Sequence, residues 1–120
     1  MTYASPDQIH SVFAEAFAAG DVDALLGLYE NGAVQLQRDG SVLSGRDNLR
    51  AVFTELLSMG LTMSGEQQHT IVAGDLALTS TRYEMPDPDG TGMTTMSTAE
   101  VSHRQPDGTW RVVIDAPSFA

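Results

Sequence analysis

The sequence predicts an α+β domain in which three short helices precede a curved antiparallel sheet. Up to Gly60 the apolar residues recur at the spacing of amphipathic helices, whereas from Leu61 onward Thr, Val, Ile and Met dominate, as in strands. Turn-forming residues divide this second half into four long segments. Strands of that length are typical of a sheet that bends around an interior, so we expect one central pocket.

The first helix is expected to begin at residues 5–8. Ser5 would cap it, Pro6 suits its first position, and Gln8 completes a capping box. Gly20 is expected to end it. Its apolar face comprises Ile9, Val12, Phe13, Ala16 and Phe17.

The second helix is expected to be capped by Asp21 and to end at Asn31-Gly32. Its apolar residues would be Leu25, Leu26, Leu28 and Tyr29. A strand over residues 33–37, a turn at Asp39-Gly40 and a short return through Val42 and Leu43 then predict a hairpin.

The third helix is expected to begin at Ser44-Gly45 and to end at Gly60. Its apolar stripe comprises Leu49, Val52, Phe53, Leu56 and Leu57. The four strand segments that follow cover about 62–73, 75–85, 93–105 and 109–116. Because short turns join them in sequence, an antiparallel meander is the expected topology.

Length and charge limit the kind of protein this is. Its 120 residues suit one domain, residues 1–120, and no apolar run approaches the roughly 18 residues of a membrane span. With 16 acidic and 6 basic residues the formal net charge is −10, which disfavours nucleic acid and anionic membranes as partners. Lysine and cysteine are absent, which excludes lysine Schiff bases and disulfides. We expect a cytoplasmic protein that binds a small neutral or hydrophobic molecule, or a second copy of itself.

The order of helices, hairpin and strands resembles the cone-shaped fold of nuclear transport factor two, and more specifically its SnoaL-like family. The matching stretches are AGDVDAL (19–25), SGRD (44–47), GDLAL (74–78) and RQPDGTWRVVID (104–115). The resemblance implies a curved antiparallel sheet wrapped around N-terminal helices and a homodimer packed through the outer sheet faces. It leaves function open, because isomerases, dehydratases, epoxide hydrolases, polyketide cyclases and domains without known catalysis share this fold.

Asp115 is the first candidate for catalysis. It ends the apolar strand 112–114, and a carboxyl that faces an apolar pocket there would have a raised pKa and act as an acid or base near neutral pH. Ketosteroid isomerase uses carboxyls in an apolar site in this way. SnoaL-like cyclases are similar in having an acidic residue on a late strand. The alternatives are an ion pair with Arg82 or Arg104, or exposure beside Pro117.

Histidine is the second candidate type, because it titrates near neutral pH. His69 alternates with Ile71 in an expected strand and could act as acid or base, although an exposed strand histidine is the commoner case. His10 is expected to be solvated on the first helix, off its apolar stripe, and His103 to lie at the surface.

Four further residues are candidate ligand contacts. Glu100 and Arg82 lie on neighbouring expected strands, either as a buried pair at the pocket floor or as a surface ion pair. Arg82 could alternatively hold an acidic substrate. Tyr29 and Tyr83 could donate hydrogen bonds to a developing oxyanion, or pack in the core.

The remaining candidates are polar or soft apolar residues. Gln35 alternates with Val34 and Leu36 and would line the pocket or face solvent. Trp110 is expected to share a face with Val112 and Ile114 and to anchor the core, a ligand or a dimer face. Methionines suit an adaptable apolar pocket, and those near expected strand ends are Met63, Met85, Met93 and Met96.

Motifs for metals, phosphates and nucleophilic serines are missing. The three histidines lack metal-ligand spacing, and residues 87–90 form only a partial calcium-loop pattern. No phosphate-binding loop or nucleophile elbow occurs. We therefore expect neither a metal nor a cofactor.

The leading hypothesis is a cofactor-free lyase, isomerase or cyclase that moves a proton on a small apolar carbonyl or polyketide-like molecule. Two alternatives stay open: a small-molecule-binding dimer without turnover, and an association domain with a filled interior.

Overall fold

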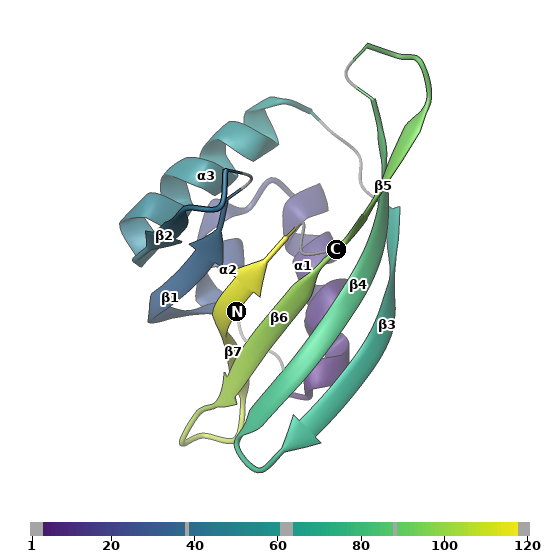
Figure 1. The fold of residues 1–120 in the computed structure, drawn as a ribbon. Coiled ribbons are helices and arrows are strands. Elements are labelled where there is room, and N and C mark those ends of the chain that lie inside the picture. The colour runs from purple at the N-terminus through teal and green to yellow at the C-terminus, as the bar shows by residue number, and fades with distance from the viewer. Residues whose placement is uncertain (1–3, 38, 61–63, 88, 118–120) are drawn as a thin grey trace.

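The computed structural model describes residues 4–37, 39–60, 64–87 and 89–117, with helices packed on one face of a seven-stranded sheet (Figure 1). The helical elements are the 3-10 helix η1 (Pro6–Gln8) and the helices α1 (Ile9–Ala18), α2 (Val22–Gly27) and α3 (Arg46–Ser58). The strands are β1 (Tyr29–Leu36), β2 (Val42–Ser44), β3 (Ser64–Ala73), β4 (Leu76–Pro86), β5 (Met93–Ser97), β6 (Ala99–Arg104) and β7 (Trp110–Ala116). None of the helices in these ranges is long and apolar enough to cross a membrane.

The sheet is mixed, with the strand order β2-β1-β7-β6-β4-β3 and with β5 paired to β4. The antiparallel pairing of β3 with β4, β4 with β6, and β6 with β7 confirms the predicted meander. The parallel pairing of β1 with β7 was not predicted. This contact joins the N-terminal hairpin to the last strand, so that β1 and β2 extend the sheet beyond β7 (Figure 1).

The helix ends follow the sequence signals in part. Asp21 caps α2 as predicted, because its side chain accepts a hydrogen bond from the backbone N–H of Ala24. Ser5 occupies the N-cap position of η1 and Pro6 follows it, as predicted, but the expected side-chain cap is not formed, since the Ser5 hydroxyl donates to Asp7 instead. The predicted end of the second helix at Asn31-Gly32 is also wrong: α2 ends at Gly27 and Tyr29 begins β1. The backbone there pairs with β7, and the Leu28 carbonyl accepts from the N–H of Val112.

The third predicted strand segment is interrupted at Thr98, which separates β5 from β6. The backbone N–H of Thr98 still donates to the carbonyl of Thr81. In return, however, the N–H of Thr81 donates to the hydroxyl of Thr98, 3.1 Å away, where a regular ladder would use a backbone carbonyl. A side chain has therefore replaced one backbone hydrogen bond at the point where the long strand turns.

Strand β7 contains a β-bulge that changes which side chains face inward. Val112 pairs with Ser102 and Ile114 pairs with Val101, so β7 has one extra residue, Val113, between these pairs. Beyond the bulge the alternation is reversed. Val112 is 1% exposed, Ile114 is 45% exposed and Asp115 is 6% exposed. The prediction that Trp110, Val112 and Ile114 share one face is therefore wrong for Ile114.

The strand register creates two adjacent rows of side chains on opposite faces of the sheet. The inner row crosses four strands through cross-strand pairs and comprises Gln35, Asp115, Glu100 and Thr79. The outer row lies one residue away and comprises Val34, Ile114, Val101, Leu78 and Ile71. The inner row is polar and buried, whereas the outer row is entirely apolar.

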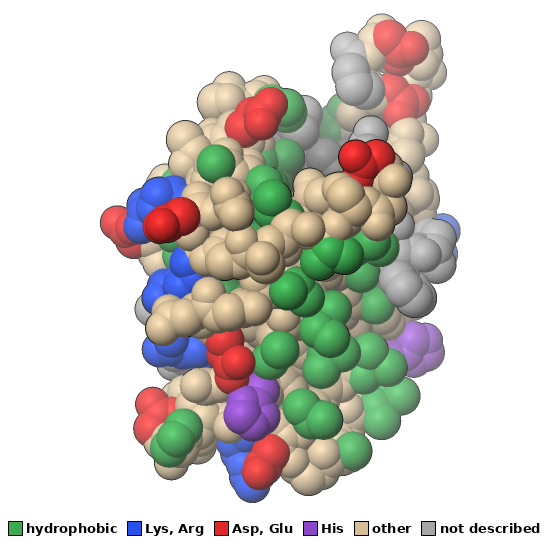
Figure 2. Space-filling view, turned by 60° about the vertical axis from the view of Figure 1, so that its left-hand side comes forward, with side chains coloured by type: hydrophobic (Ala, Val, Ile, Leu, Met, Phe, Trp, Pro, Cys, Tyr) green, Lys and Arg blue, Asp and Glu red, His purple; other side chains and the backbone are tan. Residues whose placement is uncertain are grey.

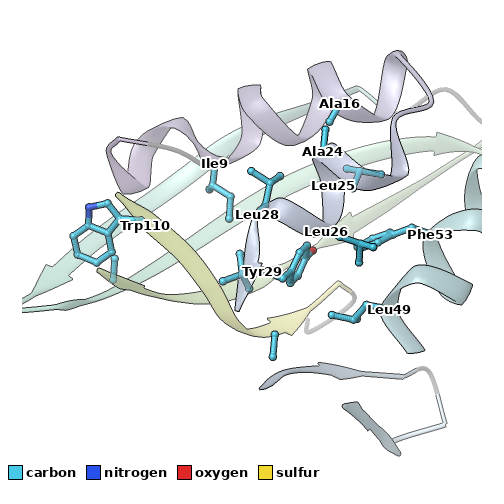
Figure 3. Close-up of a cluster of buried hydrophobic side chains, with 13 residues drawn as sticks. Ile9, Ala16, Ala24, Leu25, Leu26, Leu28, Tyr29, Leu49, Phe53 and Trp110 are labelled. Atoms are coloured by element: carbon cyan, nitrogen blue, oxygen red, sulfur yellow. The ribbon is translucent and has the colours of Figure 1, made fainter. Parts of the chain in front are cut away.

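The hydrophobic core lies between the helices and the inner face of the sheet (Figure 3). Leu25, Leu28 and Leu49 are fully buried, and each stabilises the fold by roughly 1.5–3 kcal/mol relative to an exposed position. Trp110 belongs to this core but lies at the opposite end of the cluster from Phe53 (Figure 3).

Gly65 on β3 permits a close approach of two aromatic side chains. It pairs with Tyr83 of β4, and a Cβ atom at Gly65 would lie 2.5 and 2.7 Å from two ring carbons of Tyr83 and 3.1 Å from Cε1 of His10. These separations are shorter than van der Waals contact, so any larger residue would displace the Tyr83 ring.

We expect Gly65→Ala to lower the free energy of unfolding by about 1–3 kcal/mol, because the added methyl group overpacks this contact. Urea denaturation measures the change. Gly32→Ala is the matched control, since a Cβ there meets nothing within 4 Å and should change stability by about 0.5 kcal/mol or less. Equal losses in the two variants would contradict the steric explanation.

Candidate functional site

A cavity of about 800 Å³ lies between the helices and the inner face of the sheet. Apolar side chains of α1 and α3, among them Ile9, Phe13 and Phe53, line one side of it. The sheet side carries polar groups, including Asp115 and Glu100. The carboxyl side chains of the inner row therefore border this cavity.

Asp115 is buried, and its Oδ2 atom accepts two hydrogen bonds from β1. The hydroxyl of Tyr29 donates over 2.9 Å and the side-chain amide of Gln35 over 3.1 Å. Burial raises the pKa of Asp115, and the two hydrogen bonds oppose this by stabilising the anion. The alternative ion pair with Arg104 is excluded because Arg104 pairs with Asp75.

Glu100 is the second buried carboxyl group, and its two oxygens accept hydrogen bonds from different threonines. The hydroxyl of Thr79 donates to Oε2 over 2.9 Å and that of Thr98 to Oε1 over 2.5 Å. Burial, with a further contribution from Asp115, raises the pKa of Glu100 from its ordinary value of 4.5 to about 7, although the threonine hydrogen bonds lower it. Glu100 is therefore poised to exchange a proton near neutral pH.

The two carboxyl groups are neighbours without a compensating cation. Glu100 and Asp115 are direct cross-strand partners, a position that brings Cβ atoms to roughly 4.5–5.5 Å of each other. No arginine is found among the described residues that line the cavity, and the chain has no lysine. Because two adjacent buried carboxylates repel each other, ionising both is costly and the pair favours retaining one proton.

Two tyrosine hydroxyls complete the polar part of the site. Burial and the nearby carboxyl groups raise the pKa of both Tyr29 and Tyr83, so both remain protonated hydrogen-bond donors at neutral pH. The hydroxyl of Tyr83 also lies 3.2 Å from Nδ1 of His10. Both rings line the cavity.

The structure brings together five of the eight predicted site residues at the cavity: Asp115, Glu100, Gln35, Tyr29 and Tyr83. It does not bring the other three there. His69 is exposed on β3, Arg82 is exposed on β4, and Trp110 is buried at the far end of the core.

The predicted ion pair of Glu100 with Arg82 is not formed. The hydrogen bonds of Glu100 go to Thr79 and Thr98. On β4, Thr79 and Thr81 are buried and Arg82 is exposed, so the alternation of the strand turns the arginine to the outer face.

His10 was predicted to be solvated, and this prediction is wrong. It is half-buried, lines the cavity and packs edge-on against Tyr83 with ring centroids 5.3 Å apart. The available signal was its spacing of three residues from Phe13, which places both on one side of a helix. His103 lies at the surface as predicted, paired with Glu30.

The four methionines expected near the pocket differ in where the structure places them. Met96 lines the cavity, whereas Met93 is exposed elsewhere. Met63 and the side chain of Met85 lie outside the described residues. Within the described ranges, no group of three or more histidine and carboxyl side chains is arranged to hold a metal ion.

We expect Glu100→Gln to stabilise the protein at high pH. Since the pKa of Glu100 is raised on folding, the folded state binds more protons than the unfolded state between pH 4.5 and about 7. The wild-type free energy of unfolding therefore loses a contribution on the order of 3 kcal/mol as pH rises through this window, and the glutamine variant does not.

Urea denaturation of both proteins at several pH values measures this. The stability difference between Glu100→Gln and wild type should grow from about pH 5 to about pH 8. The exposed Glu84→Gln serves as control and should show no such growth. A difference that is constant with pH would show that Glu100 titrates normally.

Comparison with known proteins identifies the family of this fold. The family model described as a SnoaL-like domain matches residues 11–113. A comparison with curated proteins gave no match.

Solved structures with the same fold carry different functional descriptions. One is assigned as a candidate calcium/calmodulin-dependent protein kinase type II association domain from Thiobacillus denitrificans, with 18% identity, 99% of each chain covered and a TM-score of 0.79. A candidate dehydratase of the NTF2-like family from Streptomyces avermitilis shows 20% identity over 92% of each chain, with a TM-score of 0.69. A ketosteroid isomerase-like protein from Erwinia carotovora atroseptica shows 17% identity over 89% of this chain and 87% of that one, with a TM-score of 0.67. At these identities the likeness extends to the fold alone.

Proposed function

The chain belongs to the SnoaL-like domain family, and from that premise we propose that it binds a small, mostly apolar carbonyl compound and moves a proton on it. The observation that carries the proposal is the pair of buried carboxyl groups, Glu100 and Asp115, at the wall of a cavity of about 800 Å³. A cavity of this size suits a small organic ligand.

Glu100 is the group that exchanges the proton in this proposal. Its pKa of about 7 makes the ionised form available as a base and the protonated form available as an acid at neutral pH. Asp115, held by Tyr29 and Gln35, places a second carboxyl group beside it and keeps that pKa high.

Tyr83 is the proposed donor to the carbonyl oxygen. Its hydroxyl lines the cavity, stays protonated at neutral pH and lies near the imidazole of His10. A donor aimed at the oxygen stabilises the negative charge that develops when a proton leaves the adjacent carbon. Abstraction of that proton by Glu100 and its return at another carbon would isomerise the substrate. Loss of a leaving group instead would give an elimination.

We expect the protein to catalyse exchange of the α-protons of 2-tetralone, an apolar bicyclic ketone, with deuterium from solvent. The rate should rise with pH and level off above about 7, because the base must be ionised. Proton NMR in heavy water measures the exchange.

Two variants test the roles of the pair. Glu100→Gln should lower the exchange rate by about 100-fold or more. Asp115→Asn should move the midpoint of the pH profile to lower pH, because it removes the neighbouring charge that raises the pKa of Glu100. The exposed Glu84→Gln is the control. Unchanged exchange in both pocket variants would refute the catalytic assignment and leave the alternative of a ligand-binding domain without turnover.

We also propose that two copies of the chain associate through the outer sheet face. Hydrophobic side chains gather in one area of this face (Figure 2). The outer row includes Ile71, which is 59% exposed, and Leu78, which is 44% exposed. The row includes no acidic residue, so two chains of net charge −10 can approach there without direct repulsion between carboxylates. A second copy is therefore the partner that this surface suits best.

We expect Leu78→Glu to convert a dimer into a monomer, because the new charges would face each other across the apolar contact. Analytical ultracentrifugation over micromolar concentrations measures the mass. Val42→Glu on β2 is the control, since Val42 is also exposed to solvent, at 63% against 44% for Leu78, but lies outside the outer row. A monomeric wild-type protein would refute this mode of association.

A further inference from the structure

The charged groups of the cavity are of one sign. Besides Glu100 and Asp115, its lining includes the carboxyl groups of Glu55 and Asp87. His10 contributes the one imidazole among the described lining residues. An anionic ligand in this cavity would therefore meet buried carboxyl groups, with no arginine among the described lining residues to offset them and no lysine anywhere in the chain.

Aromatic faces make up much of the rest of the wall. Phe13, Phe53, Tyr29 and Tyr83 all line the cavity. The rings of Phe53 and Tyr29 have centroids 5.5 Å apart, and those of Phe53 and Phe13 are 6.1 Å apart, so the aromatic surface is continuous from α1 to β1. Aromatic rings beside carboxylates form the usual surroundings of an organic cation, which they attract through their negative π faces.

We propose that the molecule taken by this pocket carries a protonated amine, which lies against Glu100 and Asp115 while the apolar part of the molecule packs on the aromatic wall. This assignment rests on the proposed function, because it names the substrate class of the same pocket. An amine-bearing carbonyl compound fits both.

The carboxyl pair supplies the physical reason. Without a ligand, the two adjacent groups favour retaining one proton. A bound ammonium group donates N–H bonds to the carboxylates and replaces that proton, which leaves Glu100 for solvent. Both carboxyl groups are then ionised, so Glu100 is present in the form that can act as a base. The cationic substrate thereby generates the base that its own reaction needs.

In the part of the chain that the structure describes, no arginine lines the cavity beside the pair. The polar and titratable groups that face the pair are Tyr29 and Gln35 of β1, Thr79 and Tyr83 of β4, Thr98 before β6, and His10 of α1. The tyrosine, glutamine and threonine groups are neutral donors or acceptors at neutral pH, and the hydrogen bond of His10 is to Tyr83 rather than to a carboxyl group. The charge of the pair is therefore left for a ligand to balance.

Three probes that share one ring system and differ in charge test the proposal: 1-naphthylmethylamine, which is protonated, 1-naphthalenemethanol, which is neutral, and 1-naphthoate, which is anionic. Isothermal titration calorimetry with the full chain at about pH 8 measures their affinities. We expect the ammonium probe to bind on the order of tenfold more tightly than the alcohol, and the carboxylate probe to bind most weakly.

Two further measurements separate charge recognition from general affinity. Glu100→Gln should reduce binding of the ammonium probe on the order of tenfold while leaving binding of the alcohol nearly unchanged, and the exposed Glu84→Gln should change neither. At about pH 6, the heat of binding of the ammonium probe should depend on the ionisation enthalpy of the buffer, because a proton is released.

The outcomes distinguish this inference from the proposed function. If the alcohol binds as tightly as the ammonium probe, or if no probe binds while 2-tetralone still exchanges, the charge preference is wrong and the proton-transfer site stands. If no probe binds and 2-tetralone does not exchange, both are wrong. Preferential binding of the ammonium probe without any proton exchange supports the ligand class and refutes the catalysis.

Discussion

One extra residue in the last strand, Val113, decides which side chains of β7 face the interior of the protein. Before it, β7 turns Trp110 and Val112 inward, and regular alternation would continue with Ile114 inside and Asp115 outside. The bulge reverses this order, so an isoleucine faces outward and a carboxyl group is buried. Asp115 in the polar inner row and Ile114 in the apolar outer row both follow from that reversal.

Burying Asp115 next to Glu100 works against stability, since adjacent carboxyl groups repel each other and neither has a cationic partner among the described residues around the cavity. The fold offsets part of this with neutral hydrogen-bond donors: Tyr29 and Gln35 bind one carboxyl group, Thr79 and Thr98 the other. Hydroxyl and amide donors stabilise a carboxylate without cancelling its charge. The result is a pair that retains a proton up to about neutral pH and can exchange it there, which is the property that a proton-transfer site requires.

The errors in the sequence-based predictions have a common physical cause. Tyr29 fits a helical apolar face by spacing, yet its backbone pairs with β7, more than eighty residues away. Arg82 and Glu100 lie on neighbouring strands as predicted, but the register turns them to opposite faces. His10 becomes part of the cavity only because Tyr83 folds over Gly65 and reaches it. Each case depends on a long-range pairing that local spacing does not encode.

From the sequence alone, most of the order of elements, the meander and the turn positions could be derived, because hydrophobic periodicity and turn chemistry act over a few residues. The SnoaL-like family was indicated by the resemblance of four sequence stretches and not by these patterns. A carboxyl group after an apolar run was also enough to select Asp115. Only the tertiary structure decided that Asp115 faces inward and that Glu100 is its neighbour rather than the partner of Arg82. It also decided that one tyrosine, one glutamine and two threonines donate hydrogen bonds to the pair. A bulge and a strand register arise from pairing between distant segments, and a shift of one residue in either moves every following side chain to the opposite face of the sheet.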